Sequence, residues 1–173
     1  MEQNSPQNLV ENPDPIRVSF RVPIETFSIN AMYYNDGRIK TSEARQWTVR
    51  LCEELSKFEP ELALIRENFK EKEHGLVIDL TAFYPKEKIM KEEGGLSSRA
   101  HDISNWEKPL IDVLFLPKYF NLKPPKGFKN LNMDDKFNIE TRSRKLPSPV
   151  DGFTIQIKIE IVLLTDYLGK LEY

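Results

Sequence analysis

Cysteine is nearly absent from this chain, because Cys52 is the only one among 173 residues. A single thiol excludes an internal disulfide and is typical of a reducing compartment. No apolar run approaches the roughly 20 residues that a bilayer-spanning helix needs. The first fifteen residues have no basic segment followed by an apolar one, so they do not resemble a signal peptide. We therefore expect a cytoplasmic protein with no membrane partner.

An excess of basic charge is also missing. The chain has 25 Lys and Arg against 27 Asp and Glu, with a net charge of −2. This balance removes any global attraction to nucleic acid and leaves local basic patches as the route to such a partner. Hydrophobic residues make up 39% of the chain and charged ones 30%, which is ordinary for a globular protein. We expect residues 1–15 to be a disordered polar leader and residues 16–173 to form one domain.

Alternating apolar and polar residues predict the strands. Residues 16–22 and 153–164 alternate over their length and predict half-buried strands. Residues 76–84 are dense in β-forming side chains and predict an inner strand. Residues 137–144 also alternate, and we expect them to pair antiparallel with 153–164 through a connection that contains two prolines, Pro147 and Pro149.

Two amphipathic helices are predicted from the spacing of apolar residues. The first is capped by Thr41 or Ser42. Its apolar positions fall on one stripe: Ala44, Trp47, Thr48, Leu51 and Leu55. The second begins near Ser104 or Asn105, because Pro109 fits only in a first turn. Its inward positions are Trp106, Pro109, Leu110, Val113 and Leu114.

The remaining segments predict turns and loops. Asn35-Asp36-Gly37 predicts a short hairpin between residues 31–34 and 38–40. Residues 58–73 are compatible with a short helix or a loop, and residues 85–100 with a mobile loop. We therefore expect the α+β class: a single domain whose mixed β-sheet has two main helices packed on one face.

The densest group of chemically useful residues is H-D-I-S-N-W-E-K-P-L-I-D at 101–112, followed by Asp134-Asp135. Carboxylates suit Mg²⁺, which completes its coordination with water and substrate phosphate oxygens. His101 is a further candidate, although a lone histidine is more often structural or exposed. The same residues also have a purely structural interpretation.

In that interpretation, Ser104-x-x-Glu107 is a capping box at a helix start. Lys108 and Asp112 form an i,i+4 ion pair. The paired aspartates are an ordinary turn before a strand. From the residues alone, both interpretations stay open.

The two segments together resemble the RusA family of Holliday junction resolvases. The family motif is Asp-x-Asp-Asn-x-x-Lys followed downstream by Asp-Asp, and residues 102–108 read D-I-S-N-W-E-K here. An N-terminal element is similar as well, with matching positions at Ser28, Asn30, Tyr34, Arg38 and Thr41. The resemblance covers the chain from Ile16 to Leu164. Ser104 departs from it, because the family has a second aspartate there.

A second departure is an insertion at residues 117–132, which contains lysines and aromatic residues but no acidic one before Asp134. Basic and aromatic side chains together favour contact with nucleic acid. The alternative is a proline-rich surface loop with solubilising lysines. With this insertion, the resemblance describes residues 16–173 as a RusA-like nuclease domain with a basic loop.

The resemblance implies a homodimeric, Mg²⁺-dependent endonuclease that cleaves branched DNA such as a four-way junction. It implies that Asp102 and Asp135 hold one or two Mg²⁺ ions with help from Asp134, and that Lys108 neutralises charge on the scissile phosphate. The residues expected to contact DNA are Asn30, Tyr34, Arg38, Asn105, Lys118, Lys123, Lys126 and Lys129. Ser104 keeps an alternative open, in which the protein binds branched DNA without cutting it.

Overall fold

The computed structural model describes residues 15–31, 33–34, 39–92, 94–95, 103–115 and 126–169. Several expectations lie outside this part of the chain: the leader at 1–14, the turn at 35–37, the mobile loop at 96–100, the first part of the basic insertion, and His101, Asp102, Arg38, Lys118 and Lys123. The side chains of Tyr34 and Ser104 are also outside it. No helix among the described residues is long and apolar enough to cross a membrane.

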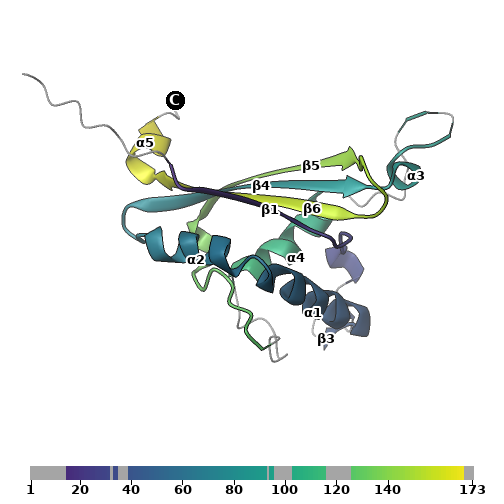
Figure 1. The fold of residues 1–173 in the computed structure, drawn as a ribbon, viewed down its shortest axis with the longest axis horizontal. Coiled ribbons are helices and arrows are strands. Elements are labelled where there is room, and N and C mark those ends of the chain that lie inside the picture. Colours follow the sequence, from purple (N-terminus) through teal and green to yellow (C-terminus); the bar gives the residue numbers. More distant parts are fainter. Residues whose placement is uncertain are drawn as a thin grey trace, which may run out of the picture.

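A four-stranded sheet forms the centre of the fold (Figure 1). Its strands are β1 (Arg17–Val22), β4 (His74–Tyr84), β5 (Asn138–Pro147) and β6 (Thr154–Leu163), in the order β1-β6-β4-β5. β6 pairs antiparallel with both β1 and β4, whereas β5 pairs parallel with β4. The predicted mixed sheet is therefore confirmed, as is the inner position of the segment at 76–84.

The expected pairing of residues 137–144 with 153–164 is wrong, because β4 lies between β5 and β6. The physical reason is burial. β4 and β6 carry the chain's densest rows of Ile, Leu and Val, so the two central positions bury most apolar surface. β5 reads N-I-E-T-R-S-R-K-L-P and has no fully buried residue, which suits an edge.

Three helices cover one face of the sheet: α1 (Ser42–Ser56), α2 (Glu59–Asn68) and α4 (Ile103–Phe115) (Figure 1). α1 and α4 are the two main helices that the sequence predicts. Residues 58–73 are compatible with a short helix or a loop on sequence grounds, and the structure has the helix α2 there. The expected loop after β4 begins with a short helix, α3 (Lys86–Ile89). A further short helix, α5 (Leu164–Gly169), follows β6.

The N-terminal hairpin is confirmed as β2 (Tyr33–Tyr34) paired antiparallel with β3 (Ile39–Lys40). It follows a 3₁₀ turn, η1 (Ile29–Ala31), and a second such turn, η3 (Asp135–Phe137), precedes β5. Thr41 caps α1 as predicted, because its hydroxyl accepts a hydrogen bond from the Ala44 amide at 3.1 Å. The core lies between the sheet and the three helices, where Trp47 and Trp106 are both fully buried.

The start of α4 differs from the prediction. The helix begins at Ile103, so Pro109 lies in its second turn rather than its first. The proline removes the amide that would bond to the Asn105 carbonyl. Ser104 consequently lies inside the helix, and the expected capping box does not form its start. Pro109 is tolerated because its ring is buried with the apolar side of α4.

Candidate functional site

The polar side of α4 carries the lysine of the motif. Lys108 Nζ lies 3.3 Å from Asp112 Oδ1, which confirms the predicted i,i+4 pair. The two side chains differ in exposure, at 61% for Lys108 and 11% for Asp112. The carboxylate is thus mostly withdrawn from water while the ammonium group faces it. This arrangement keeps a positive charge at the surface of α4, where an anionic ligand can reach it.

The residue before Lys108 joins α4 to the edge of the sheet. Glu107 Oε2 accepts a hydrogen bond of 2.7 Å from the Ser143 hydroxyl on β5. Asn105, two residues earlier, is half-buried. Sequence reasoning missed Ser143, because its position depends on which strand α4 covers. The contact fixes the rotation of α4 and with it the direction of Lys108.

Asp134 and Asp135 form the turn before β5, as the structural interpretation predicts. Asp134 is the N-cap of η3, and its Oδ1 accepts a hydrogen bond of 2.9 Å from the Lys136 amide. That bond lowers the pKa of the Asp134 carboxyl, and the nearby Lys136 ammonium lowers it further. Asp135 is exposed. The turn therefore presents two adjacent acidic side chains to solvent.

Lys136 is a neighbour of the two aspartates that no sequence pattern singles out. Its ammonium nitrogen lies 3.5 Å from Asp134 Oδ2 and 3.8 Å from Glu71 Oε1. Phe137 anchors the turn by an edge-to-face contact with Phe69, at 5.1 Å between ring centroids. η3 also contacts α4 and β4. The two aspartates are thus brought to the helix that carries Lys108.

The N-terminal element of the resemblance is built around η1. The Asn30 backbone N–H donates to the Ser28 hydroxyl at 3.2 Å, and the Thr41 hydroxyl donates to the Ala31 carbonyl at 3.0 Å. The Thr41 side chain thus both caps α1 and holds η1 in place. Asn30 is exposed, and η1 contacts α4. Two segments that are distant from each other in the sequence, η1 and η3, therefore both contact α4.

The last part of the basic insertion is tied to the end of α4. The Leu131 amide donates to the Leu114 carbonyl at 2.8 Å, and the buried Asn130 side chain donates to the Val113 carbonyl at 3.5 Å. Arg66 on α2 donates to the Asn130 carbonyl at 2.9 Å. Lys126 and Lys129 are exposed next to this anchor. Sequence reasoning found the two lysines but not the anchor, because a buried asparagine has no signature in the sequence.

The described residues contain no group of three or more His, Cys, Asp or Glu side chains placed to hold a metal ion. Asp134 and Asp135 do supply the oxygen donors that Mg²⁺ prefers, and one or two carboxylates suffice where phosphate and water complete the shell. The low pKa of Asp134 keeps its carboxylate ionised, which suits a cation. The donor set therefore fits Mg²⁺, with Asp102 as the remaining candidate outside the described residues.

The fold and this arrangement define a single α+β domain in which an acidic turn contacts the helix that carries an exposed lysine. No family model matches the chain, and no curated protein matches it. Any assignment of function therefore depends on the residues and geometry described above.

Proposed function

We propose that this chain is a Mg²⁺-dependent endonuclease that cleaves branched DNA, similar to the RusA family of Holliday junction resolvases. One observation supports the proposal most directly. Two of the segments on which the resemblance depends, η1 and η3, both contact α4, the helix that carries the third segment at residues 103–108. These contacts support the proposal, because the motif residues would have to share one region of the fold in order to act together.

The side chains have distinct roles in this proposal. Asp102 and Asp135 hold the metal with help from Asp134, whose low pKa keeps it ionised. When bound, Mg²⁺ supplies an activated water and stabilises charge on the phosphate. Lys108 presents its exposed ammonium to the scissile phosphate. Asn105 and Asn30 position the DNA strand beside α4, and Lys126 and Lys129 contact its backbone.

The proposed enzyme is a homodimer, because a two-fold axis presents one site to each of two opposing strands of a four-way junction. We infer a cytoplasmic location from the scarcity of cysteine.

The decisive experiment is cleavage of a labelled four-way junction with and without Mg²⁺. Symmetric nicks that require Mg²⁺ are expected from the unaltered protein. Asp102→Asn, Asp135→Asn and Lys108→Gln should each reduce the cleavage rate by about a hundredfold or more. Asp166→Asn, which alters an exposed aspartate on α5, is the matched control and should cut normally. Nicks that persist without Mg²⁺ or survive Asp135→Asn would overturn the proposal.

A second function is favoured by Ser104, which stands where the family has an aspartate. A hydroxyl is a weaker ligand for Mg²⁺ than a carboxylate. In this alternative the protein binds the junction without cutting it. Ser104→Asp distinguishes the two: it should create Mg²⁺-dependent cleavage in a protein that otherwise only binds, whereas an active resolvase already cuts without the change.

A further inference from the structure

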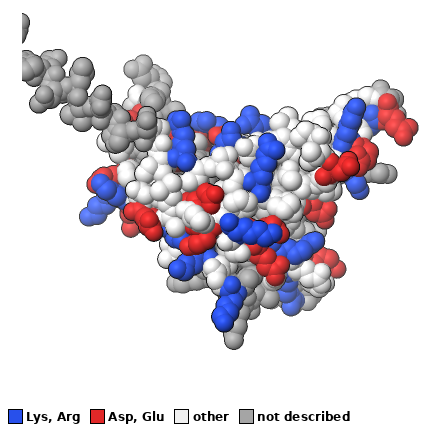
Figure 2. All heavy atoms as spheres, viewed as in Figure 1, with Lys and Arg blue, Asp and Glu red and all other residues white. Residues whose placement is uncertain are grey.

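The face of the sheet opposite the three helices carries a concentration of basic side chains. Alternate residues of all four strands point to this open face; α1, α2 and α4 cover the other face, and the short helix α5 borders the open face at one end (Figure 1). Its basic residues are Arg17, Arg21, Arg142, Arg144 and Lys158. Its acidic residues are Asp79, Glu140 and Glu160. Figure 2 shows Lys and Arg side chains gathered along the upper border, above the sheet. An acidic protein thus has one surface with a basic surplus.

Two of the three acidic residues are already neutralised at one end of this face. Arg17 Nη2 lies 2.9 Å from Glu160 Oε1, and Arg142 Nη2 donates to Glu140 Oε2 at 2.9 Å. The Tyr167 hydroxyl of α5 also bonds to Glu140. The uncompensated charge therefore lies toward the opposite end.

At that end, arginine side chains lie against the sheet. Arg21 and Arg144 stand in the same cross-strand row, separated by Gln156 and Thr81. Arg144 Nε donates to the Thr81 hydroxyl at 2.9 Å. Lys158 stands one row away, beside Asp79. The three basic side chains outnumber the one acidic residue near them.

An aromatic ring completes this surface. Phe83, on the central strand β4, is half-buried in the row after Thr81, and the Arg21 guanidinium lies 5.0 Å from its ring centroid. Its neighbour on β5 is Leu146, which is 41% exposed. Nucleic-acid bases stack on aromatic rings and on guanidinium planes. We name the group Arg21, Phe83, Arg144 and Lys158 the open-face patch.

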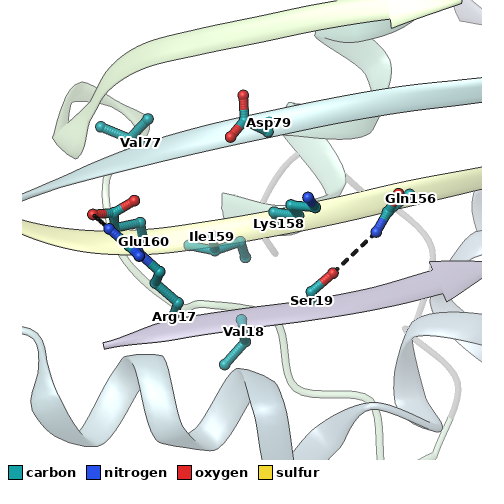
Figure 3. A pocket seen from close by; sticks show the side chains of 9 residues that line it. All are labelled: Arg17, Val18, Ser19, Val77, Asp79, Gln156, Lys158, Ile159 and Glu160. Carbon is teal, nitrogen blue, oxygen red and sulfur yellow. Dashed lines mark hydrogen bonds and ion pairs between the residues drawn. The ribbon is translucent and has the colours of Figure 1, made fainter. Parts of the chain in front are cut away.

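A hollow of about 450 Å³ adjoins the open-face patch. It lies over β1, β6 and β4, and Lys158 is part of its lining. Figure 3 shows the Ser19 hydroxyl and the Gln156 amide, which are joined by a hydrogen bond of 3.2 Å. Gln156 is the cross-strand partner of Arg21. The hollow is large enough for a small ligand or a nucleotide. Its charged lining is balanced, with Arg17 and Lys158 against Glu160 and Asp79. Its neutral Ser19 and Gln156 groups suit sugar and base edges, and phosphate contacts are left to Arg21 and Arg144 of the open-face patch.

We propose that the open-face patch and this hollow bind a single-stranded segment of DNA, on the side of the sheet away from α4. The choice of DNA rests on the proposed function, but the surface is a separate one. A flat sheet has no projecting element to enter a duplex groove, whereas an exposed ring and guanidinium groups suit unpaired bases. A second copy of the chain is a poorer occupant, because a two-fold axis would set the basic patch against itself.

The test is fluorescence anisotropy of a labelled twenty-nucleotide oligo(dT), in EDTA, over a series of KCl concentrations. Arg21→Gln and Arg144→Gln should each weaken binding and reduce the slope of log K against log salt by about 0.7. Phe83→Leu should weaken binding by roughly fivefold or more and leave the slope unchanged. Arg50→Gln, which removes an exposed arginine of α1 on the helical side, is the matched control and should bind normally. Circular dichroism checks that each variant is folded.

Three results would overturn the inference. The first is no binding of oligo(dT) at low salt, and the second is wild-type affinity and slope in the arginine variants. The third is a dimer in sedimentation equilibrium that Arg21→Gln dissociates without altering oligo(dT) binding. The last result would make the face a contact between copies. Junction cleavage separates this inference from the proposed function. If the protein fails to cut but its oligo(dT) binding depends on Arg21 and Phe83, the proposed nuclease fails and the open-face site stands.

Discussion

Two buried threonines differ in how their hydroxyl groups are satisfied. Thr26 Oγ1 lies 2.7 Å from the Tyr84 hydroxyl, in a hydrogen bond that is inaccessible to water. Thr48 Oγ1, in α1, is buried without a hydrogen-bond partner among the described residues. Burying a polar atom without a partner costs free energy, whereas a satisfied one is nearly neutral. The same substitution should therefore have opposite effects at the two positions.

We expect Thr48→Val to raise the free energy of unfolding by about 1 kcal/mol, because a methyl group replaces an unsatisfied hydroxyl of similar size. Thr26→Val should lower it by about 1–2 kcal/mol, because the Tyr84 hydroxyl would stay buried without this partner. Urea unfolding measures both, and the slope m should not change. A lower midpoint for Thr48→Val would mean that its hydroxyl is satisfied in solution.

Asp134 should titrate below the ordinary range of an aspartate. The main cause is the hydrogen bond from the Lys136 amide, so the pKa of Asp134 should stay low in Lys136→Gln, which keeps the amide and removes the ammonium. The folded-state pKa lies below the unfolded one. The ionised cap therefore stabilises the fold at pH values above the unfolded pKa, and this stabilisation is lost as the pH falls through the folded pKa. Side-chain NMR titration measures the value, and a normal pKa in Lys136→Gln would assign the effect to the ammonium instead.

At the scale of elements, α4 is joined to the edge strand β5 by the hydrogen bond between Glu107 and Ser143. Ser143→Ala should lower the free energy of unfolding by about 1 kcal/mol, because Glu107 would lose a partner while half-buried. Hydrogen exchange of the β5 amides should also accelerate. Ser19→Ala is the matched control, since its bond to Gln156 lies on the open face and does not involve a helix. Equal effects in the two variants would show that the α4 contact has no special role.

Elements with a clear periodicity could be predicted from the sequence, and their neighbours in space could not. β1, β4, β6 and the Thr41 cap of α1 follow from local patterns, because alternation and capping depend on residues close in the chain. The separation of β5 from β6 does not, since it results from competition among strands for the buried central positions. The sequence of α2 does not decide between helix and loop, because it is highly charged and its only fully buried residues are Leu62 and Ile65.

At the candidate site too, local contacts could be predicted from the sequence and tertiary contacts could not. The Lys108–Asp112 pair and the turn at Asp134 were predicted, because each depends on residues at most four apart. The meeting of η1, η3 and α4 depends on tertiary packing, as does the Glu107–Ser143 bond. Total charge was also a poor guide to surface charge, because the net value of −2 conceals the basic side chains of the open face.

At the scale of the whole molecule, bound metal should appear as added stability even in the absence of DNA. A cation that binds only the folded chain stabilises it by RT ln(1 + [Mg²⁺]/Kd), so the melting temperature rises with the concentration of the cation. We expect MgCl₂ at about ten times its dissociation constant to raise Tm by roughly 3–5 °C relative to NaCl of equal ionic strength. Asp135→Asn should abolish that rise, whereas Asp166→Asn on α5 should preserve it. Differential scanning calorimetry makes the measurement without any cleavage step. An equal rise in the unaltered protein and in Asp135→Asn would place the cation elsewhere and remove Asp135 from the proposed metal site.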